Sequence, residues 1–162
     1  EGLKQYYTSV PKDKPVHIAG VLPQYNNNSA TSAKFFGGVV SFNAEMFRRV
    51  NGYPNNYWGW GGEDDELRRR VNDINLQIEN PEEEDCEITD LEEMNLQEKL
   101  QVLRENQDWK NMKKNELKEQ HSQTWKDNGV NSIEGEYLDW SDEKINNSRV
   151  CIIYWWYWSL SD

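Results

Sequence analysis

One run of residues is unlike the rest of the chain: Asn51-Gly52-Tyr53-Pro54-Asn55-Asn56-Tyr57-Trp58-Gly59-Trp60-Gly61-Gly62-Glu63-Asp64-Asp65-Glu66. It opens with two dipeptides typical of turns. Its glycines allow backbone angles that other residues disfavour, and they let a ligand approach the main chain closely. Trp58 and Trp60 offer flat apolar faces with an indole N–H, a surface that suits a sugar ring or a base. This run, residues 51–66, is called the signature below.

Four acidic residues end the signature, and Leu67-Arg68-Arg69-Arg70-Val71 follows them. The pattern predicts the start of a helix, where the helix dipole favours negative charge. A carboxylate held there beside aromatic side chains can serve as a general base. The same pattern also fits a plain surface helix with i,i+4 ion pairs, and the tryptophans then belong to the core. The residues alone leave a ligand site and a structural helix start as alternatives.

The signature resembles that of the β-1,4-galactosyltransferases, and Phe35-Phe36-Gly37-Gly38-Val39 resembles the glycine motif that precedes it in that family. The resemblance covers residues 35–71, with weaker likeness upstream to Tyr6 and downstream at 127–132. It implies an α/β fold: the C-terminal, acceptor-side half of a Rossmann-like (GT-A type) glycosyltransferase domain with a mixed sheet. We expect one domain over residues 1–162, with an acidic, helical insertion at 82–120.

The same resemblance implies a set of site residues. Asp64 matches the position of the catalytic base in the family. The acceptor-binding positions are Glu63, Asp65 and Trp58. The donor-binding positions are Trp60, Gly38 and Phe35, where phenylalanine replaces a tyrosine and so removes a hydroxyl group.

Members of the family use a divalent metal, usually manganese, to neutralise the departing nucleotide diphosphate. An Asp-x-Asp motif and a downstream Met-x-x-His motif hold this metal. The first motif falls upstream of Glu1 by the resemblance, and Met94 and Met112 are followed at the third position by Gln97 and Asn115. We therefore expect no metal ligand and no cofactor in this chain, and manganese only if it is part of an active enzyme.

Two functions fit this pattern. The first is a pseudoenzyme, a non-catalytic structural or binding subunit of a larger assembly. We expect it to contact other protein chains through a Trp-rich tail at 150–158 or through helices at 89–120. A sugar is a further candidate ligand. The missing metal ligands, the insertion and the tail favour it. The alternative is the C-terminal half of an active β-1,4-galactosyltransferase that moves galactose from UDP-galactose to N-acetylglucosamine or xylose.

Composition limits the partners and the compartment. The net charge of −11 argues against duplex nucleic acid and anionic membrane surfaces as partners. No run reaches the roughly 18 apolar residues of a membrane helix. Cys86 and Cys151 form one disulfide or remain two thiols. The resemblance implies that the protein is located in the Golgi lumen. The alternative is another organelle such as the mitochondrion, which a cleaved targeting leader before Glu1 would explain.

Hydrophobic periodicity predicts the elements around the signature. Strands are expected at 16–19, 39–42 and 75–79, and residues 150–158 fit either a buried strand or a docking surface. Asn43 is expected to cap a helix at 44–50, and a second helix covers 63–72. Thr89 and Glu92 predict a capping box for an amphipathic helix or helical pair. Its apolar face comprises Leu96, Leu100, Leu103, Trp109 and Met112.

Overall fold

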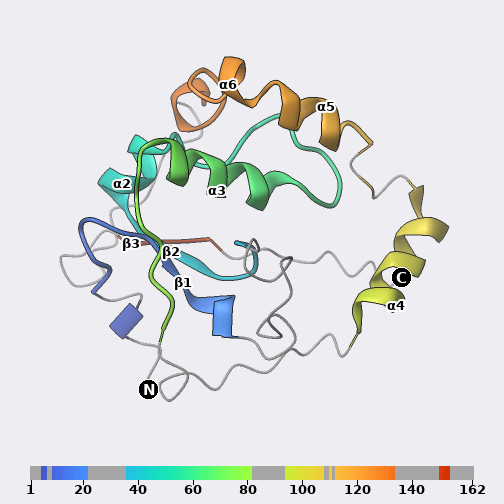
Figure 1. Cartoon of the computed structure of the whole chain (residues 1–162), viewed down its shortest axis with the longest axis horizontal. Coiled ribbons are helices and arrows are strands. Elements are labelled where there is room, and N and C mark those ends of the chain that lie inside the picture. Colours follow the sequence, from blue (N-terminus) through green and yellow to red (C-terminus); the bar gives the residue numbers. More distant parts are fainter. Residues whose placement is uncertain are drawn as a thin grey trace.

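A computed structural model describes residues 5–6, 9–21, 36–81, 94–107, 110, 112–133 and 150–153. Three short strands lie at the centre, and helices surround them (Figure 1). The strands are β1 (Val16–His17), β2 (Val40–Asn43) and β3 (Val150–Ile153). The helices are α2 (Ala44–Arg49), α3 (Glu63–Asp73), α4 (Leu96–Glu105), α5 (Lys114–Glu119) and α6 (His121–Thr124). The 3-10 turns are η1 (Ile18–Val21) and η5 (Val130–Ser132). No helix of the described residues is both long and apolar enough to span a bilayer.

The sheet has the order β1-β2-β3, and both strand pairs are antiparallel. An isolated parallel bridge joins Val16 to Glu79, so in the described part of the chain the predicted mixed sheet consists of two antiparallel pairs and this parallel bridge. The predicted strand at 75–79 is wrong, because only Glu79 pairs with a neighbouring strand. Leu76 and Ile78 alternate with polar residues because both pack against the core.

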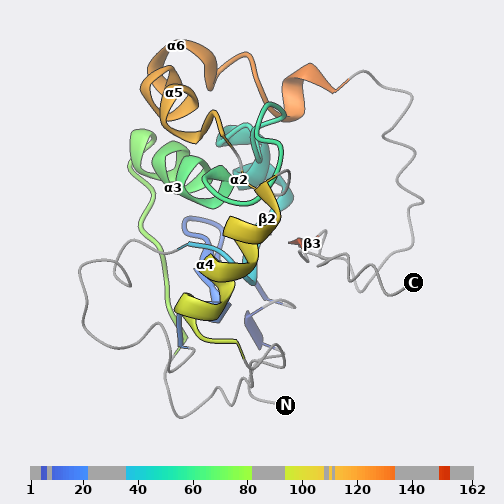
Figure 2. The same ribbon diagram turned by 90° about the vertical axis from the view of Figure 1, so that its right-hand side faces the viewer.

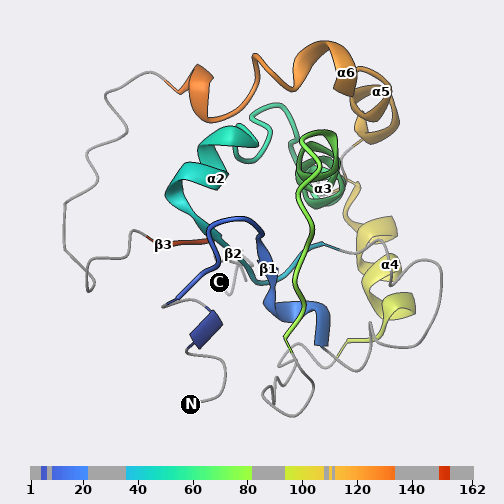
Figure 3. The same cartoon turned by 60° about the vertical axis from the view of Figure 1, so that its left-hand side comes forward.

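The core lies between β2 and the two helices α2 and α3, which stand on the same side of the sheet (Figure 3). Its buried members are Phe36, Val40, Phe42, Met46, Val50, Leu67 and Val71. On α3 the buried side chains recur at helical spacing, which is why this charged helix still contributes two apolar residues to the core. The predicted helix at 63–72 and the predicted strand at 39–42 are confirmed to within one residue.

Local capping fixes the direction in which the chain enters the signature. The side chain of Asn43 accepts a hydrogen bond from the backbone N–H of Met46 (2.8 Å), as expected of an N-cap. The helix stops because Asn51 and Gly52 both adopt left-handed backbone angles, with φ of 58° and 60°. The Asn51-Gly52 turn thus ends α2 and begins the signature.

The prediction of helices between 89 and 120 is confirmed for α4 and α5, whereas Thr89 and Glu92 lie outside the described residues. The observed capping box of α4 joins Asn95 and Glu98. α4 stands at one side of the molecule, away from α5 and α6 (Figures 1 and 2). The placement of Met112 on an apolar face is wrong: its side chain is 73% exposed, because the helix has already ended at Glu105.

One further prediction is resolved in part, and two stay predictions. Residues 150–153 form strand β3, and the remainder of the 150–158 tail lies outside the described residues. Cys86 also lies outside them, so the pairing of the cysteines stays open. The expected insertion at 82–120 remains a prediction.

Candidate functional site

The signature forms an irregular loop that leads directly into α3. Gly61 and Gly62 both have φ of 103°, a left-handed conformation that side chains disfavour. A Cβ atom on Gly62 would lie 2.8 Å from Cε1 of Tyr57 and 3.1 Å from Cγ of Lys114. The two glycines are therefore needed to let a tyrosine ring and a lysine stem pack against the loop.

The two tryptophans of the signature lie at the surface. Trp58 is 80% exposed and Trp60 is 38% exposed, so the structural alternative that places them in the core is wrong. The Nζ atom of Lys114 lies 6.0 Å from the centre of the Trp60 ring, within cation–π range. A parallel bridge between Trp60 and Lys110 ties this side of the loop to the chain before α5. Two accessible aromatic faces thus stand beside the start of α3.

The acids that follow are half-buried, and burial governs their electrostatics. Burial raises the pKa of Glu63 from its ordinary value of 4.5 to about 7. Burial, with the adjacent Asp65 carboxylate adding to it, also raises the pKa of Asp64. The Oδ1 atom of Asp64 accepts the backbone N–H of Asp65 (2.8 Å). These two carboxyl groups therefore exchange protons closer to neutral pH than ordinary carboxyl groups do.

Some polar atoms of this region are buried without a hydrogen-bond partner among the described residues. They include Oε2 of Glu63 and the hydroxyl group of Tyr57. Burial raises the pKa of Tyr57 to about 12, so its hydroxyl group stays protonated and can donate a hydrogen bond. Unsatisfied buried groups are uncommon in folded proteins, and a bound ligand or water often completes them.

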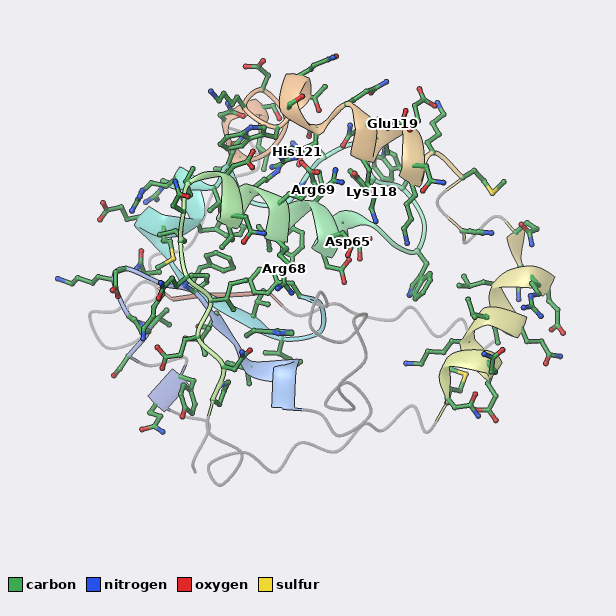
Figure 4. The ribbon with its side chains drawn as sticks, viewed as in Figure 1. Asp65, Arg68, Arg69, Lys118, Glu119 and His121 are labelled. Atoms are coloured by element: carbon green, nitrogen blue, oxygen red, sulfur yellow. The ribbon has the colours of Figure 1, made fainter. Side chains whose placement is uncertain are left out.

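Helices α5 and α6 lie along α3 and are joined to it by ionic contacts (Figure 4). Asp65 pairs with Lys118, and Arg69 donates to the backbone carbonyl of Lys118. Asp65, one of the predicted acceptor-binding residues, is thus already engaged with α5. This ion pair joins α5 to the first turn of α3, and the acceptor-binding role of Asp65 stays a prediction.

His121 joins α6 to α3 through contacts with two carboxyl groups. Its Nδ1 atom lies 2.7 Å from Oε1 of Glu66, and its Nε2 atom lies 2.9 Å from Oδ2 of Asp73. The ring also stacks on Trp125, with an angle of 9° between the two planes. Nothing in the sequence indicated this contact, because His121 lies 55 and 48 residues from its two partners.

A buried arginine connects this ionic contact to the start of the signature. The Nε atom of Arg70 donates to Oε1 of Glu66 (3.1 Å). Its Nη1 atom donates to the backbone carbonyls of Asn51 (3.1 Å) and Gly52 (3.0 Å). The amide of Asn51 in turn donates to the carbonyl of Trp125 (2.9 Å). The signature turn, α3 and the segment after α6 therefore form one hydrogen-bonded unit.

Gly38, one of the predicted donor-side residues, comes from a different part of the fold than Trp60. Gly38 precedes β2 and has φ of 74°, and a Cβ atom there would lie 2.8 Å from Cβ of Ala19. Phe35 lies outside the described residues. Next to Gly38, Nε2 of His17 lies 2.9 Å from the carbonyl of Gly37, and burial lowers the pKa of His17 to about 4. His17 is therefore a neutral structural histidine.

The described residues do not fit the metal ligand set of the family. Within these residues, no three His, Cys, Asp or Glu side chains are arranged to hold a metal ion. The chain has two histidines, and the structure shows both in other contacts: His17 with a backbone carbonyl and His121 with two carboxylates. Met112 is exposed, and the residue three positions after it is Asn115 and not a histidine.

The raised pKa of Glu63 predicts a pH-dependent stability. Between about pH 4.5 and about pH 7 the folded protein holds this proton and the unfolded chain does not. The stability that Glu63 contributes is therefore complete below pH 4.5 and is lost as the pH rises through about 7. We expect the free energy of unfolding, measured with urea across this range, to fall less steeply in Glu63→Gln than in the wild type. Glu45→Gln, at an exposed carboxylate, is the control, and equal slopes for Glu63→Gln and the wild type would contradict the prediction.

Comparison with known proteins shows what this part of the chain is similar to. Residues 17–95 match the family model described as the N-terminal domain of galactosyltransferase. β-1,4-Galactosyltransferase 4 of Mus musculus is 38% identical over 100 residues, which cover 62% of this chain and 26% of that protein. β-1,4-Galactosyltransferase 5 of Sus scrofa is 51% identical over 68 residues, which cover 42% of this chain and 17% of that protein.

Among solved structures, the catalytic domain of Drosophila β-1,4-galactosyltransferase 7 in complex with xylobiose is similar. The identity is 38%, and the alignment covers 44% of this chain and 29% of that chain with a TM-score of 0.38, too low to show a shared fold. The matched part spans about a quarter of the length of the curated relatives. The expected C-terminal half is not supported, because the matching family model is described as an N-terminal domain. The signature and its helix α3 therefore lie within a galactosyltransferase-like domain, similar in sequence to the β-1,4-galactosyltransferases.

Proposed function

We propose that this chain carries the acceptor side of a β-1,4-galactosyltransferase site. A terminal sugar binds over Trp58 and over Trp60, which the family resemblance assigns to the donor side, and Asp64 is the base that receives a proton from a hydroxyl group of that sugar. One observation carries the proposal: two exposed indole rings stand beside two carboxyl groups, Glu63 and Asp64, whose pKa values burial has raised. The likeness of residues 17–95 to galactosyltransferases supports it.

The chemistry follows from these positions. The acceptor hydroxyl oxygen bonds to the anomeric carbon of galactose, its proton passes to Asp64, and UDP leaves with the electrons of the broken bond. A base whose pKa lies nearer neutral pH accepts this proton more readily, and a positioned base contributes about 10²- to 10⁴-fold to such a reaction. The unpartnered Oε2 of Glu63 accepts a hydrogen bond from a second hydroxyl group of the same sugar. None of these roles involves manganese, because the described residues do not offer the metal ligand set of the family.

A non-catalytic binding or structural subunit is the second candidate. The observation that favours it is the use of both histidines in other contacts, which leaves the described residues without the metal ligands of the family. Such a subunit binds the sugar and does not transfer galactose. Two predictions belong to this second candidate. The subunit contacts other chains through residues 150–158 or 89–120, and it lies in the Golgi lumen or another organelle.

Calorimetric titration with N-acetylglucosamine and with xylose tests the binding step that both candidates share. A ring stacked on a tryptophan buries apolar surface worth about 1.5–3 kcal/mol, so Trp60→Ala is expected to raise Kd about 10- to 100-fold. Ile133→Ala is the matched control, because Ile133 is also 38% exposed and lies outside the signature. Absence of binding by the wild type at millimolar concentrations of either sugar would contradict a sugar site here.

A further inference from the structure

Lys114, the first residue of α5, lies across the signature and comes from outside residues 17–95, which match the galactosyltransferase family model. Its Nζ atom is 6.0 Å from the centre of the Trp60 ring. A Cβ atom on Gly61 would lie 3.3 Å from the same Nζ atom, and one on Gly62 would lie 3.1 Å from the lysine Cγ. The lysine stem therefore fills the space that the two glycines leave open.

The position of Lys114 is fixed by the helix that carries it. One turn further along α5, Lys118 pairs with Asp65, and beyond α5 His121 contacts Glu66 and Asp73 (Figure 4). These contacts hold α5 along the first turns of α3. A side chain on a docked helix is better positioned than one on a free loop, so Lys114 approaches Trp60 from a defined direction.

The charges around the two carboxyl groups assign a second role to the same lysine. The Asp64 carboxylate acts on Glu63, the Asp65 carboxylate acts on Asp64, and the Lys114 ammonium acts on both Glu63 and Asp64. Burial and the neighbouring acids raise the pKa values of these two carboxyl groups, and the lysine opposes that rise. The neighbouring cations are committed elsewhere, since Lys118 pairs with Asp65 and Arg70 pairs with Glu66.

We propose that Lys114 is a positioning residue of this site, whose stem and ammonium group hold Trp60 against the Gly61-Gly62 turn and face the two carboxyl groups at the start of α3. The role rests on the proposed function. A carboxyl group can receive a proton only if it is ionised, and the sugar can bind in a defined position only if the Trp60 ring is held in place. It also extends the site from one continuous stretch of sequence to a second segment, α5, about 50 residues further along the chain.

The test is an NMR titration of the side-chain carboxyl carbons of Glu63 and Asp64 in the absence of sugar, together with the indole N–H resonance of Trp60. Lys114→Met is expected to move both titration midpoints to higher pH and to shift the Trp60 resonance. Lys114→Arg restores both to near the wild-type positions, because the charge is kept. Lys126→Met is the matched control, since Lys126 lies over the ring of Trp125 at a similar distance, 5.8 Å, outside the signature.

Two outcomes would overturn the proposal. The first is that Lys114→Met changes neither the two titration midpoints nor the Trp60 resonance. The second is that Lys126→Met shifts the midpoints as much as Lys114→Met does, which would reveal a general charge effect. Because no sugar is present, these readouts are independent of whether the protein binds or transfers a sugar. If the proposed function also holds, the acidic limb of the pH profile of kcat moves to higher pH in Lys114→Met. An unchanged acidic limb would show that the lysine does not act on the base.

Discussion

Replacing Arg70 with methionine is expected to lower the free energy of unfolding by about 3–5 kcal/mol, the cost of breaking a buried ion pair by removing one partner. Arg70 is fully buried and donates to Glu66 and to the carbonyls of Asn51 and Gly52. Methionine keeps much of the apolar stem but leaves these buried acceptors without the guanidinium. Urea denaturation followed by tryptophan fluorescence measures the change.

Arg69→Met is the matched control, because Arg69 is the preceding residue on α3 and its side chain is exposed. Its hydrogen bond to the carbonyl of Lys118 is worth about 1 kcal/mol. Equal losses of stability in the two variants would contradict the role of Arg70 as the connection between α3 and the signature turn.

Replacing Asp64 with asparagine is expected to lower kcat for galactose transfer about 10²- to 10⁴-fold, because an amide has the shape of the carboxylate but cannot accept the proton. The Kd for the acceptor sugar changes little, since an amide oxygen still accepts a hydrogen bond. Steady-state kinetics with UDP-galactose and N-acetylglucosamine measure the rate, and calorimetry measures the Kd.

Asp127→Asn serves as the control for this variant, because Asp127 is an exposed carboxylate in the turn after α6. It is expected to keep the wild-type rate. A near wild-type kcat in Asp64→Asn would show that another group is the base, and a loss of sugar binding would show that Asp64 orders the site rather than taking the proton.

The local features of the fold were predictable from the sequence because their causes are local. Asn43 caps α2 with a side chain three residues from its partner, and the acidic run starts α3 because of the helix dipole. The error at 75–79 has a different cause. Alternating apolar residues form a strand only if a neighbouring chain pairs with them, and here Leu76 and Ile78 alternate because they pack against the core.

The candidate site was predictable only in part. Its aromatic rings, glycines and acids are contiguous, so their pattern is visible in the sequence. The groups that hold them in place are not contiguous. Lys118 lies 53 residues from Asp65 and His121 lies 55 residues from Glu66, and only the packing of α5 and α6 on α3 brings these pairs together. Asp65 for this reason has a structural partner that the signature alone does not reveal.

The most direct test of the acceptor site is mass spectrometry of N-acetylglucosamine and xylose after incubation with the protein, UDP-galactose and Mn²⁺. The proposal predicts that the wild type adds the mass of one hexose to one of these sugars and that Asp64→Asn does so far more slowly. An acceptor that binds to the wild type but never gains a hexose would contradict the catalytic proposal, and the chain would then be a sugar-binding module.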